Sequence, residues 1–233
     1  LKALRKGFPW PALVPLLLAR EPSAAVTQAV DGAVPAEQRR QRGDRQLIQF
    51  HYDASNAFYA LFLDPEMVYS CAYFTDWDNS LEEAQRAKLD LICRKLRLRA
   101  GETFLDIGCG WGALVCHAAR HYGVRAHGVT LSQAQLDLAR DRIARLGLAE
   151  RVTVELRDFR DLAGTYDKIA SVGMYEHVGI ANYGAYFGKI RQLLADRGVF
   201  LNHGITRRAK RDERRFRTSS ASRRIILRYI FPG

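Results

Sequence analysis

The turn that follows one short apolar strand constrains this chain more than any other stretch. Residues 104–112 read FLDIGCGWG, in which Asp106 precedes three glycines at alternate positions. A helical pattern follows at once, so the backbone must turn sharply at the carboxyl edge of a sheet, where open α/β folds bind ligands. Glycine permits the positive φ angles that such a turn needs and lets a ligand approach the backbone closely. We therefore expect a ligand at this turn.

The spacing of the turn distinguishes it from two common nucleotide loops. It has the form G-x-G-x-G with an acid two residues earlier, whereas dinucleotide loops have G-x-G-x-x-G and P-loops have Lys followed by Ser or Thr. We interpret it as a loop for S-adenosylmethionine. An ordinary glycine-rich turn explains the glycines alone equally well, so the interpretation depends on the residues around it.

The pattern after residue 101 is that of a doubly wound α/β fold. The expected strands are 103–107, 125–130, 151–156, 168–172 and 198–202, and the expected helices are 111–122, 132–146 and 183–194. Gly123, Gly147 and Gly198 stand where we expect helices to end. Before this core, Ser80 and Glu83 form a capping box for a helix that runs to about residue 96.

Polar and aromatic residues follow the second and third expected strands. Thr130 and Gln135 can hydrogen-bond a ligand, although a helix cap and a solvent-facing glutamine are equally good readings. Asp158 offers an acid for an exocyclic amine and Phe159 a ring for a purine, the alternative for Phe159 being an ordinary core position. Since the carboxyl ends of parallel strands meet at one edge, we expect these residues beside Asp106.

The fourth and fifth strands end in residues that suit catalysis better than a core. Glu176 follows the fourth strand in Gly-Met-Tyr-Glu-His-Val-Gly, and His203 follows the fifth. Both side chains would need polar partners if they were buried. We predict that they lie at the same edge and act together.

Several functions lose support from absent motifs. The sequence has no G-x-S-x-G elbow and no His-Cys-Cys metal set, so we expect neither a hydrolase nor a bound metal. The Asn/Asp-Pro-Pro-Tyr/Phe motif of nucleic-acid amino-methyltransferases is replaced by Gly-Met-Tyr-Glu-His. We therefore expect no nucleic-acid substrate.

The chain is strongly basic, with a formal net charge of +11 and a pI near 9.8. Residues 207–228 hold ten Lys or Arg against Asp212 and Glu213, which predicts either a solvated loop or a patch for a polyanion. From charge alone the polyanion could be nucleic acid or an anionic membrane surface. The four cysteines show no C-x-x-C pair, and a reduced cytoplasmic set of thiols is the simplest account. We find no membrane-spanning run and no signal peptide.

Taken together, these motifs resemble the cyclopropane-fatty-acyl-phospholipid synthase family, which includes mycolic-acid cyclopropane synthases and fatty-acyl C-methyltransferases. The stretches that carry the resemblance are His51-Tyr52-Asp53, 69–74 (YSCAYF), 105–112, 128–132 (GVTLS), 158–161 (DFRD), 171–179 (SVGMYEHVG) and 228–233 (RYIFPG). The resemblance implies a Rossmann-like class I methyltransferase sheet with helical N-terminal additions.

The resemblance also implies a reaction: transfer of a methyl group from S-adenosylmethionine to a cis double bond of a phospholipid acyl chain, giving a cyclopropane through a carbocation. A bound bicarbonate would take the departing proton. The residues that match the family's catalytic set are Cys71, Glu176, His203 and Ile205. The residues that match its cofactor contacts are Tyr69, Ser70, Asp106, Gly108, Gly110, Thr130, Gln135, Asp158 and Phe159.

The resemblance divides the chain into four parts. Residues 1–45 would be the remnant of an N-terminal region and linker, 46–100 a helical cap over the cofactor site, 101–206 the Rossmann-like core, and 207–233 a basic segment leading to an absent substrate region. Such a protein would work in the cytoplasm, peripheral to the inner face of the membrane. Its oligomeric state is not fixed by the sequence, and a homodimer is one possibility.

Two features depart from the family pattern. Asn202-His203-Gly204-Ile205 stands where Leu-His-Thr-Ile is common, and the chain ends before the tyrosine that would complete the anion site. The alternatives are therefore an acyl C-methyltransferase that closes no ring, or a cofactor-binding lipid-surface module without catalysis.

Overall fold

The structure is a computed structural model that describes residues 56–179 and 182–205. The predictions for residues 1–45 and 207–233, including the basic segment, lie outside the described residues, and the prediction for 46–100 is described only from residue 56. The elements are α4 (Asn56–Ala60), α5 (Leu81–Leu96), β1 (Thr103–Ile107), α6 (Ala113–Tyr122), β2 (Arg125–Thr130), α7 (Gln133–Arg145), β3 (Val152–Leu156), η2 (Phe159–Asp161), β4 (Tyr166–Val172), η3 (Tyr175–His177), α8 (Tyr183–Leu193) and β5 (Leu194–His203).

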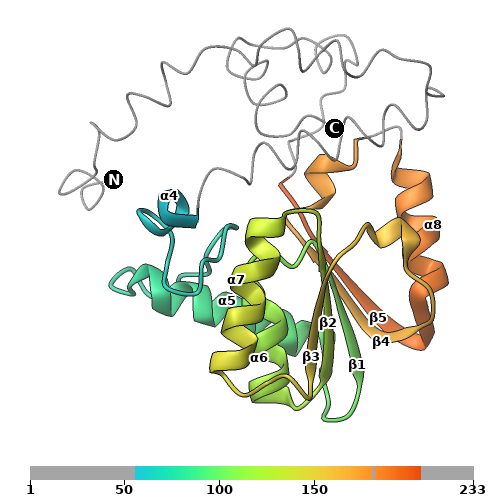
Figure 1. Ribbon diagram of the computed structural model, residues 1–233, viewed down its shortest axis with the longest axis horizontal. Helices are drawn as coiled ribbons and strands as arrows, with labels where there is room; N and C mark the ends of the chain where they lie inside the picture. The colour runs from blue at the N-terminus through green and yellow to red at the C-terminus, as the bar shows by residue number, and fades with distance from the viewer. Residues whose placement is uncertain (1–55, 180–181, 206–233) are drawn as a thin grey trace, which may run out of the picture. The chain divides into compact units, whose positions relative to one another are not determined.

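The strands form one parallel sheet in the order β3-β2-β1-β4-β5 (Figure 1). The chain order reverses beside β1, because β2 lies on one side of it and β4 on the other. Such a reversal opens a crevice at the carboxyl ends of the strands. The glycine-rich turn after β1 lies at this reversal, on the carboxyl edge of the sheet that the sequence predicted for it.

Helices cover both faces of the sheet (Figure 1). Phe104 of β1 packs with residues of α5, α6 and α7 in one apolar cluster. Leu105 and Ile107 pack with residues of α8 in another. Because successive side chains of a strand point to opposite faces, Asp106 shares the α5 side with Phe104.

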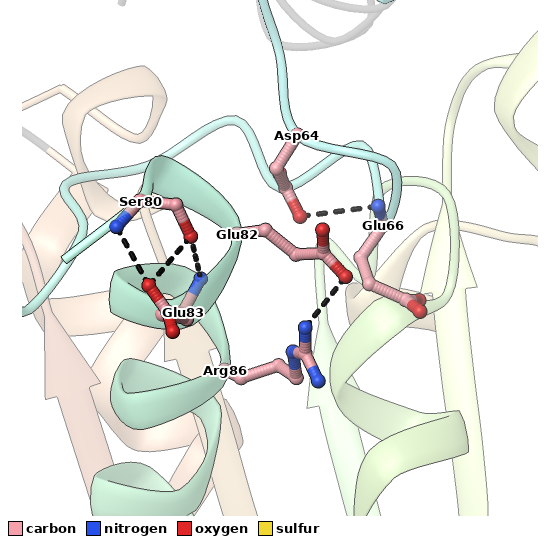
Figure 2. A network of polar contacts seen from close by, with 6 residues as sticks. All are labelled: Asp64, Glu66, Ser80, Glu82, Glu83 and Arg86. Atoms are coloured by element: carbon pink, nitrogen blue, oxygen red, sulfur yellow. Dashed lines mark hydrogen bonds and ion pairs between the residues drawn. The ribbon is translucent and has the colours of Figure 1, made fainter.

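The N-terminus of α5 carries the predicted capping box (Figure 2). The Ser80 hydroxyl accepts the Glu83 backbone N–H at 3.2 Å, and the Glu83 carboxylate accepts the Ser80 backbone N–H at 2.7 Å. Two backbone donors that a helix end leaves open are thereby satisfied. The helix ends at Leu96, as predicted, with Arg97 in the left-handed conformation at φ 54°.

The prediction for the last strand was wrong in one respect. Gly198 was expected to end a helix, yet it lies inside β5, which begins at Leu194 directly after α8. An irregularity in the pairing with β4 lies between Tyr166 and Lys168, and Arg197 has a φ of 63°. The turn-like residues 195–198 therefore form a distorted strand start instead of a separate turn.

Residues 56–80, which we call the cap segment, are held to α7 and to Trp111 by polar contacts. The Asn56 side chain donates to the Ala134 carbonyl at 3.1 Å and accepts from the Trp111 indole at 2.7 Å. Buried Arg142 of α7 donates to the carbonyl oxygens of Glu66 and Trp111, both at 2.9 Å. The cap segment is thus tied to both α7 and the residue beside the last glycine of the turn.

Candidate cofactor and catalytic site

The glycine-rich turn, residues 108–112, has the backbone that its sequence requires. Gly108, Gly110 and Gly112 have φ angles of 79°, 55° and 80°, which residues with a Cβ rarely adopt. A Cβ on Gly108 would lie 3.0 Å from the Met174 side chain, whereas one on Gly110 would meet nothing within 4 Å. Open space beside Gly110 suits a ligand that approaches the backbone.

Asp106 is buried at the end of β1 without a hydrogen bond to one of its oxygens. The residue is 3% exposed, and its buried Oδ1 has no hydrogen-bond partner. Burial raises the pKa of this carboxyl to about 7, and the nearby charge of Lys88 opposes the rise. An unpartnered buried carboxylate is costly in free energy, so this oxygen is well suited to accept a hydrogen bond from an ammonium group.

Ser70 is held beside the sheet edge by α5. Gln85 donates to the backbone carbonyls of Val68 and Ser70 at 3.1 and 2.9 Å, and Lys88 donates to the Ser70 hydroxyl at 2.5 Å. A Cβ on Gly173 would lie 3.8 Å from the Ser70 Cβ. The structure therefore brings a predicted cofactor residue of the cap segment to the carboxyl end of β4.

Thr130 and Gln135 form a buried pair at the end of β2. The Thr130 hydroxyl donates to Gln135 Oε1 at 2.7 Å, and Gln135 is 4% exposed. The helix cap of α7 is Ser132. A solvent-facing glutamine is therefore the wrong reading. The Gln135 amide nitrogen makes no hydrogen bond to any described residue, so it can still donate to a ligand.

Asp158 and Phe159 lie after β3, where the sequence placed them. The Asp158 carboxylate accepts two hydrogen bonds from the Arg160 guanidinium, at 2.9 and 2.6 Å, and one from the Arg160 backbone N–H. Phe159 packs edge-on against Tyr186, with ring centroids 5.6 Å apart. Asp158 is thus fixed in orientation by Arg160, and Phe159 belongs partly to the core cluster of α8.

The second half of the candidate site lies after β4 and β5; we call residues 173–179 and 203–205 the β4–β5 edge. Glu176 Oε1 accepts the backbone N–H of Ile205 at 2.5 Å, and Gly173 donates to the His203 carbonyl at 2.9 Å. Glu176 Oε2 and His203 Nδ1 are buried and have no hydrogen-bond partner. Glu176 and His203 are therefore brought to one edge, as predicted, with unused polar atoms.

The remaining predicted residues, Tyr69, Cys71 and Ile205, are exposed. Tyr69 is 43% exposed and packs edge-on against Tyr59, and Cys71 is an exposed free thiol. Within the described residues, no hydrogen bond joins Cys71 to Glu176 or His203. Ile205 is 59% exposed, and its N–H is used by Glu176. Glu176, His203 and Ile205 therefore lie together at the β4–β5 edge, and the catalytic role of these residues and of Cys71 stays a prediction.

The residues present fit S-adenosylmethionine. The methionine end of the cofactor carries an ammonium and a carboxylate. The site offers the unpartnered Asp106 oxygen, the Ser70 hydroxyl near Gly173, and open space at Gly110 of the glycine-rich turn. In the described part of the chain, no group of three His, Cys, Asp or Glu could hold a metal ion, and no helix there is long and apolar enough to cross a membrane.

The sheet order, the glycine-rich turn after β1 and the residues at the strand ends define the class I fold of S-adenosylmethionine-dependent methyltransferases. A solved structure described as mycolic acid cyclopropane synthase CmaA1 complexed with SAH and CTAB has a TM-score of 0.65 and 41% identity, covering 67% of this chain and 55% of that chain. Residues 39–233 match the model of the mycolic acid cyclopropane synthetase family, and the chain belongs to this family.

Two curated relatives of this chain are named for different reactions. A probable fatty acid methyltransferase of Pseudomonas putida is 48% identical over 202 residues, which are 85% of this chain and 50% of that protein. The cyclopropane-fatty-acyl-phospholipid synthase of Escherichia coli K12 is 49% identical over 155 residues, which are 66% of this chain and 39% of that protein. The chain thus spans half the length of these relatives or less.

Three residues at this site were missed in the sequence. Gln85 and Lys88 lie in the helix expected up to residue 96 and Arg142 in the helix expected over 132–146, and no role was predicted for them, yet all three are buried and bond to the cap segment or the turn. The available signal was a polar side chain on the apolar stripe of α5, with Gln85 and Lys88 three residues apart and followed by buried Ile92.

Proposed function

We propose that this protein is an S-adenosylmethionine-dependent C-methyltransferase that adds a methylene across a cis double bond of phospholipid acyl chains, giving a cyclopropane. The observation that carries the proposal is the pair of buried, unpartnered atoms Glu176 Oε2 and His203 Nδ1 at the sheet edge that also holds the glycine turn. Membership of the mycolic acid cyclopropane synthetase family supports the reaction class.

The chain's own residues would bind and orient the cofactor. Asp106 would accept from its ammonium, Ser70 and the turn backbone would bind its carboxylate, and Thr130 with Gln135 would bind the ribose side. Asp158 and Phe159 would lie at the adenine. When bound, S-adenosylmethionine supplies a methyl group on a positively charged sulfur, which an alkene can attack.

The β4–β5 edge would serve the proton that leaves the alkylated chain. Bicarbonate fits this edge in part: His203 Nδ1 can donate to an anion when it carries the proton, and Glu176 Oε2 can accept from the anion's hydroxyl. The bicarbonate would supply the base at this place, with Cys71 as a further donor. The Ile205 N–H, which could also donate to an anion, is instead bonded to Glu176.

A methyltransferase that closes no ring is the second candidate. A Cβ on Gly204 would lie 2.9 Å from the Tyr175 ring, which stacks on Tyr183 with centroids 4.4 Å apart. The glycine therefore lets Tyr175 lie where a Thr side chain would stand in the commoner family pattern, so the wall of the anion site differs. The similarity to the Pseudomonas putida protein is in keeping with this alternative.

The test uses the protein in its full natural length. We expect it to transfer labelled methyl groups from S-adenosylmethionine to vesicles of anionic phospholipid with cis-unsaturated chains, and not to saturated vesicles with the same headgroups. Fragmentation or NMR of the product distinguishes a cyclopropane from a methylene group of equal mass. Activity on a soluble small molecule, with none on any unsaturated lipid, would overturn the proposal. Cofactor binding without turnover would identify an inactive lipid-surface module.

A further inference from the structure

Lys88 of α5 is a buried cation that the proposed function does not yet use. It is 4% exposed, although lysine is almost never buried without a partner. Its ammonium donates to Ser70 Oγ at 2.5 Å, and no described carboxylate lies within 4.0 Å of it. Two of its three donors therefore remain for other partners. Burying this charge costs free energy that packing alone does not explain.

Two acids counter the effect of burial on the pKa of Lys88, Asp64 first and Asp106 second, and Asp106 is the one with an unpartnered oxygen. Asp106 points to the α5 side of the sheet, and the charges of Lys88 and Asp106 each oppose the effect of burial on the pKa of the other. Asp64 and the thiol of Cys71 also act on Lys88. Both Asp64 oxygens already accept backbone N–H groups, from Glu66 and Val68. Asp106 is thus the acidic neighbour whose buried oxygen has no bond.

The hydrogen bond from Lys88 to Ser70 also determines where the hydroxyl proton of Ser70 points. An ammonium can only donate, so the Ser70 oxygen accepts from Lys88 and its own O–H must point to another acceptor. Gln85 holds the Ser70 backbone carbonyl at 2.9 Å, so the residue cannot turn away. The result is an oriented hydroxyl donor beside Gly173.

These contacts describe a receptor for a zwitterion. An α-amino acid group presents an ammonium and a carboxylate on one carbon, and the site presents one carboxylate and one oriented hydroxyl backed by a cation. We infer that Lys88 is a positioning residue for the amino-acid end of the cofactor: it orients the Ser70 hydroxyl toward the cofactor's carboxylate and balances the charge of Asp106. This inference rests on the proposed binding of S-adenosylmethionine.

The test compares two ligands that differ only at that end. S-Adenosylhomocysteine carries the amino-acid group, and 5′-methylthioadenosine lacks it. In the full-length protein we expect Lys88→Met to weaken S-adenosylhomocysteine binding about tenfold or more, while methylthioadenosine binding stays within about twofold. Lys95→Met, which removes an exposed lysine of the same helix, is the matched control. Calorimetry measures both affinities.

A second variant separates the role of Lys88 from general damage. Ser70→Ala should reproduce the selective loss, and the Ser70→Ala/Lys88→Met double variant should lose less than the product of the two single effects, because both act through one hydroxyl. Equal loss of both ligands in Lys88→Met, or no loss of either, would overturn the inference while leaving the proposed function intact. Failure of the unmodified protein to bind S-adenosylhomocysteine would overturn both.

Discussion

The two halves of the candidate site differ in how far the chain itself satisfies them. At the cofactor half, the side chains of Ser70, Thr130, Gln135 and Asp158 are held by neighbours at 2.5–2.9 Å. At the β4–β5 edge, Glu176 and His203 each keep a buried atom without a partner, and Ile205 is exposed. The first half is therefore largely preorganised, with the Asp106 oxygen and the Gln135 amide nitrogen left open among the described residues. The second half has polar atoms whose partners the described residues do not supply.

The largest expected effect comes from a substitution that changes the β4–β5 edge alone. Glu176→Gln keeps the size of the side chain but removes the acceptor charge, and we expect methyl transfer to fall by about 10²–10⁴. Binding of S-adenosylhomocysteine should stay within about twofold, because the cofactor half is held by other contacts. Steady-state rates and calorimetry measure the two effects. Glu150→Gln, on the exposed turn before β3, is the control; equal losses of rate and binding would mean that the halves are not separate.

The second effect tests what holds the cofactor half together. Arg142 is 6% exposed and donates to the carbonyls of Glu66 and Trp111. Arg142→Met should lower the free energy of unfolding by about 2–4 kcal/mol, since it leaves these buried acceptors unpaired. Chemical denaturation measures the loss. The control is Arg145→Met, which removes an exposed arginine of the same helix. A similar loss of stability in both variants would contradict a specific role of the Arg142 hydrogen bonds.

The sequence predicted the strands of the sheet far better than the contacts by which Arg142 holds the cap segment. The predicted bounds of β1 and β2 match because turn residues follow directly after Ile107 and after Thr130. α6 begins two residues later than predicted, because Gly112 is in the left-handed conformation at its N-cap. β5 begins four residues earlier, since residues that suit a turn also fit a distorted strand.

The candidate site divides in the same way. Asp106, Glu176 and His203 were found because parallel strands bring their carboxyl ends to one edge, which is a property of the order of elements. Lys88, Gln85 and Arg142 were missed because their partners are backbone carbonyls or a hydroxyl of the cap segment. The path of that segment over α5 and α7 is a tertiary feature, with no periodic signal of its own.

The third effect concerns the open carboxylate of the cofactor half. Asp106→Asn should weaken S-adenosylhomocysteine binding by about 1.5–3 kcal/mol, the usual value of a hydrogen bond to a charged group. Stability should change in the opposite direction. Burial raises the pKa of Asp106 to about 7, above its ordinary value of 3.8. The folded state therefore holds this proton more tightly than the unfolded state, and its contribution to stability is lost as pH rises from about 4 through 7.

Thermal denaturation at two pH values checks the sign of this linkage. Without ligand, Asp106→Asn should raise the melting temperature at pH 8, where the buried charge is present, and change it less at pH 5, where Asp106 is already protonated. Lys88 offsets part of this cost, because its positive charge opposes the rise in the Asp106 pKa, so the gain should be larger in a Lys88→Met background. A lower melting temperature at pH 8 would show that the carboxylate has a stabilising partner.

The smallest effect lies outside both halves and tests whether they depend on the end of α5. Ser80→Ala removes the acceptor of the capping box and should lower the free energy of unfolding by about 1 kcal/mol. The loss should shrink in acid, because the hydrogen bonds of Ser80 to the Glu83 carboxylate lower the pKa of Glu83, and protonation ends that half of the box. Ser80→Asp, which keeps a capping oxygen, is the control. Binding of S-adenosylhomocysteine should be unchanged, because Gln85 and Lys88 lie in the following turns and hold Ser70 by their own bonds; a weaker affinity in Ser80→Ala would mean that the order of the cofactor half extends to the first turn of the helix.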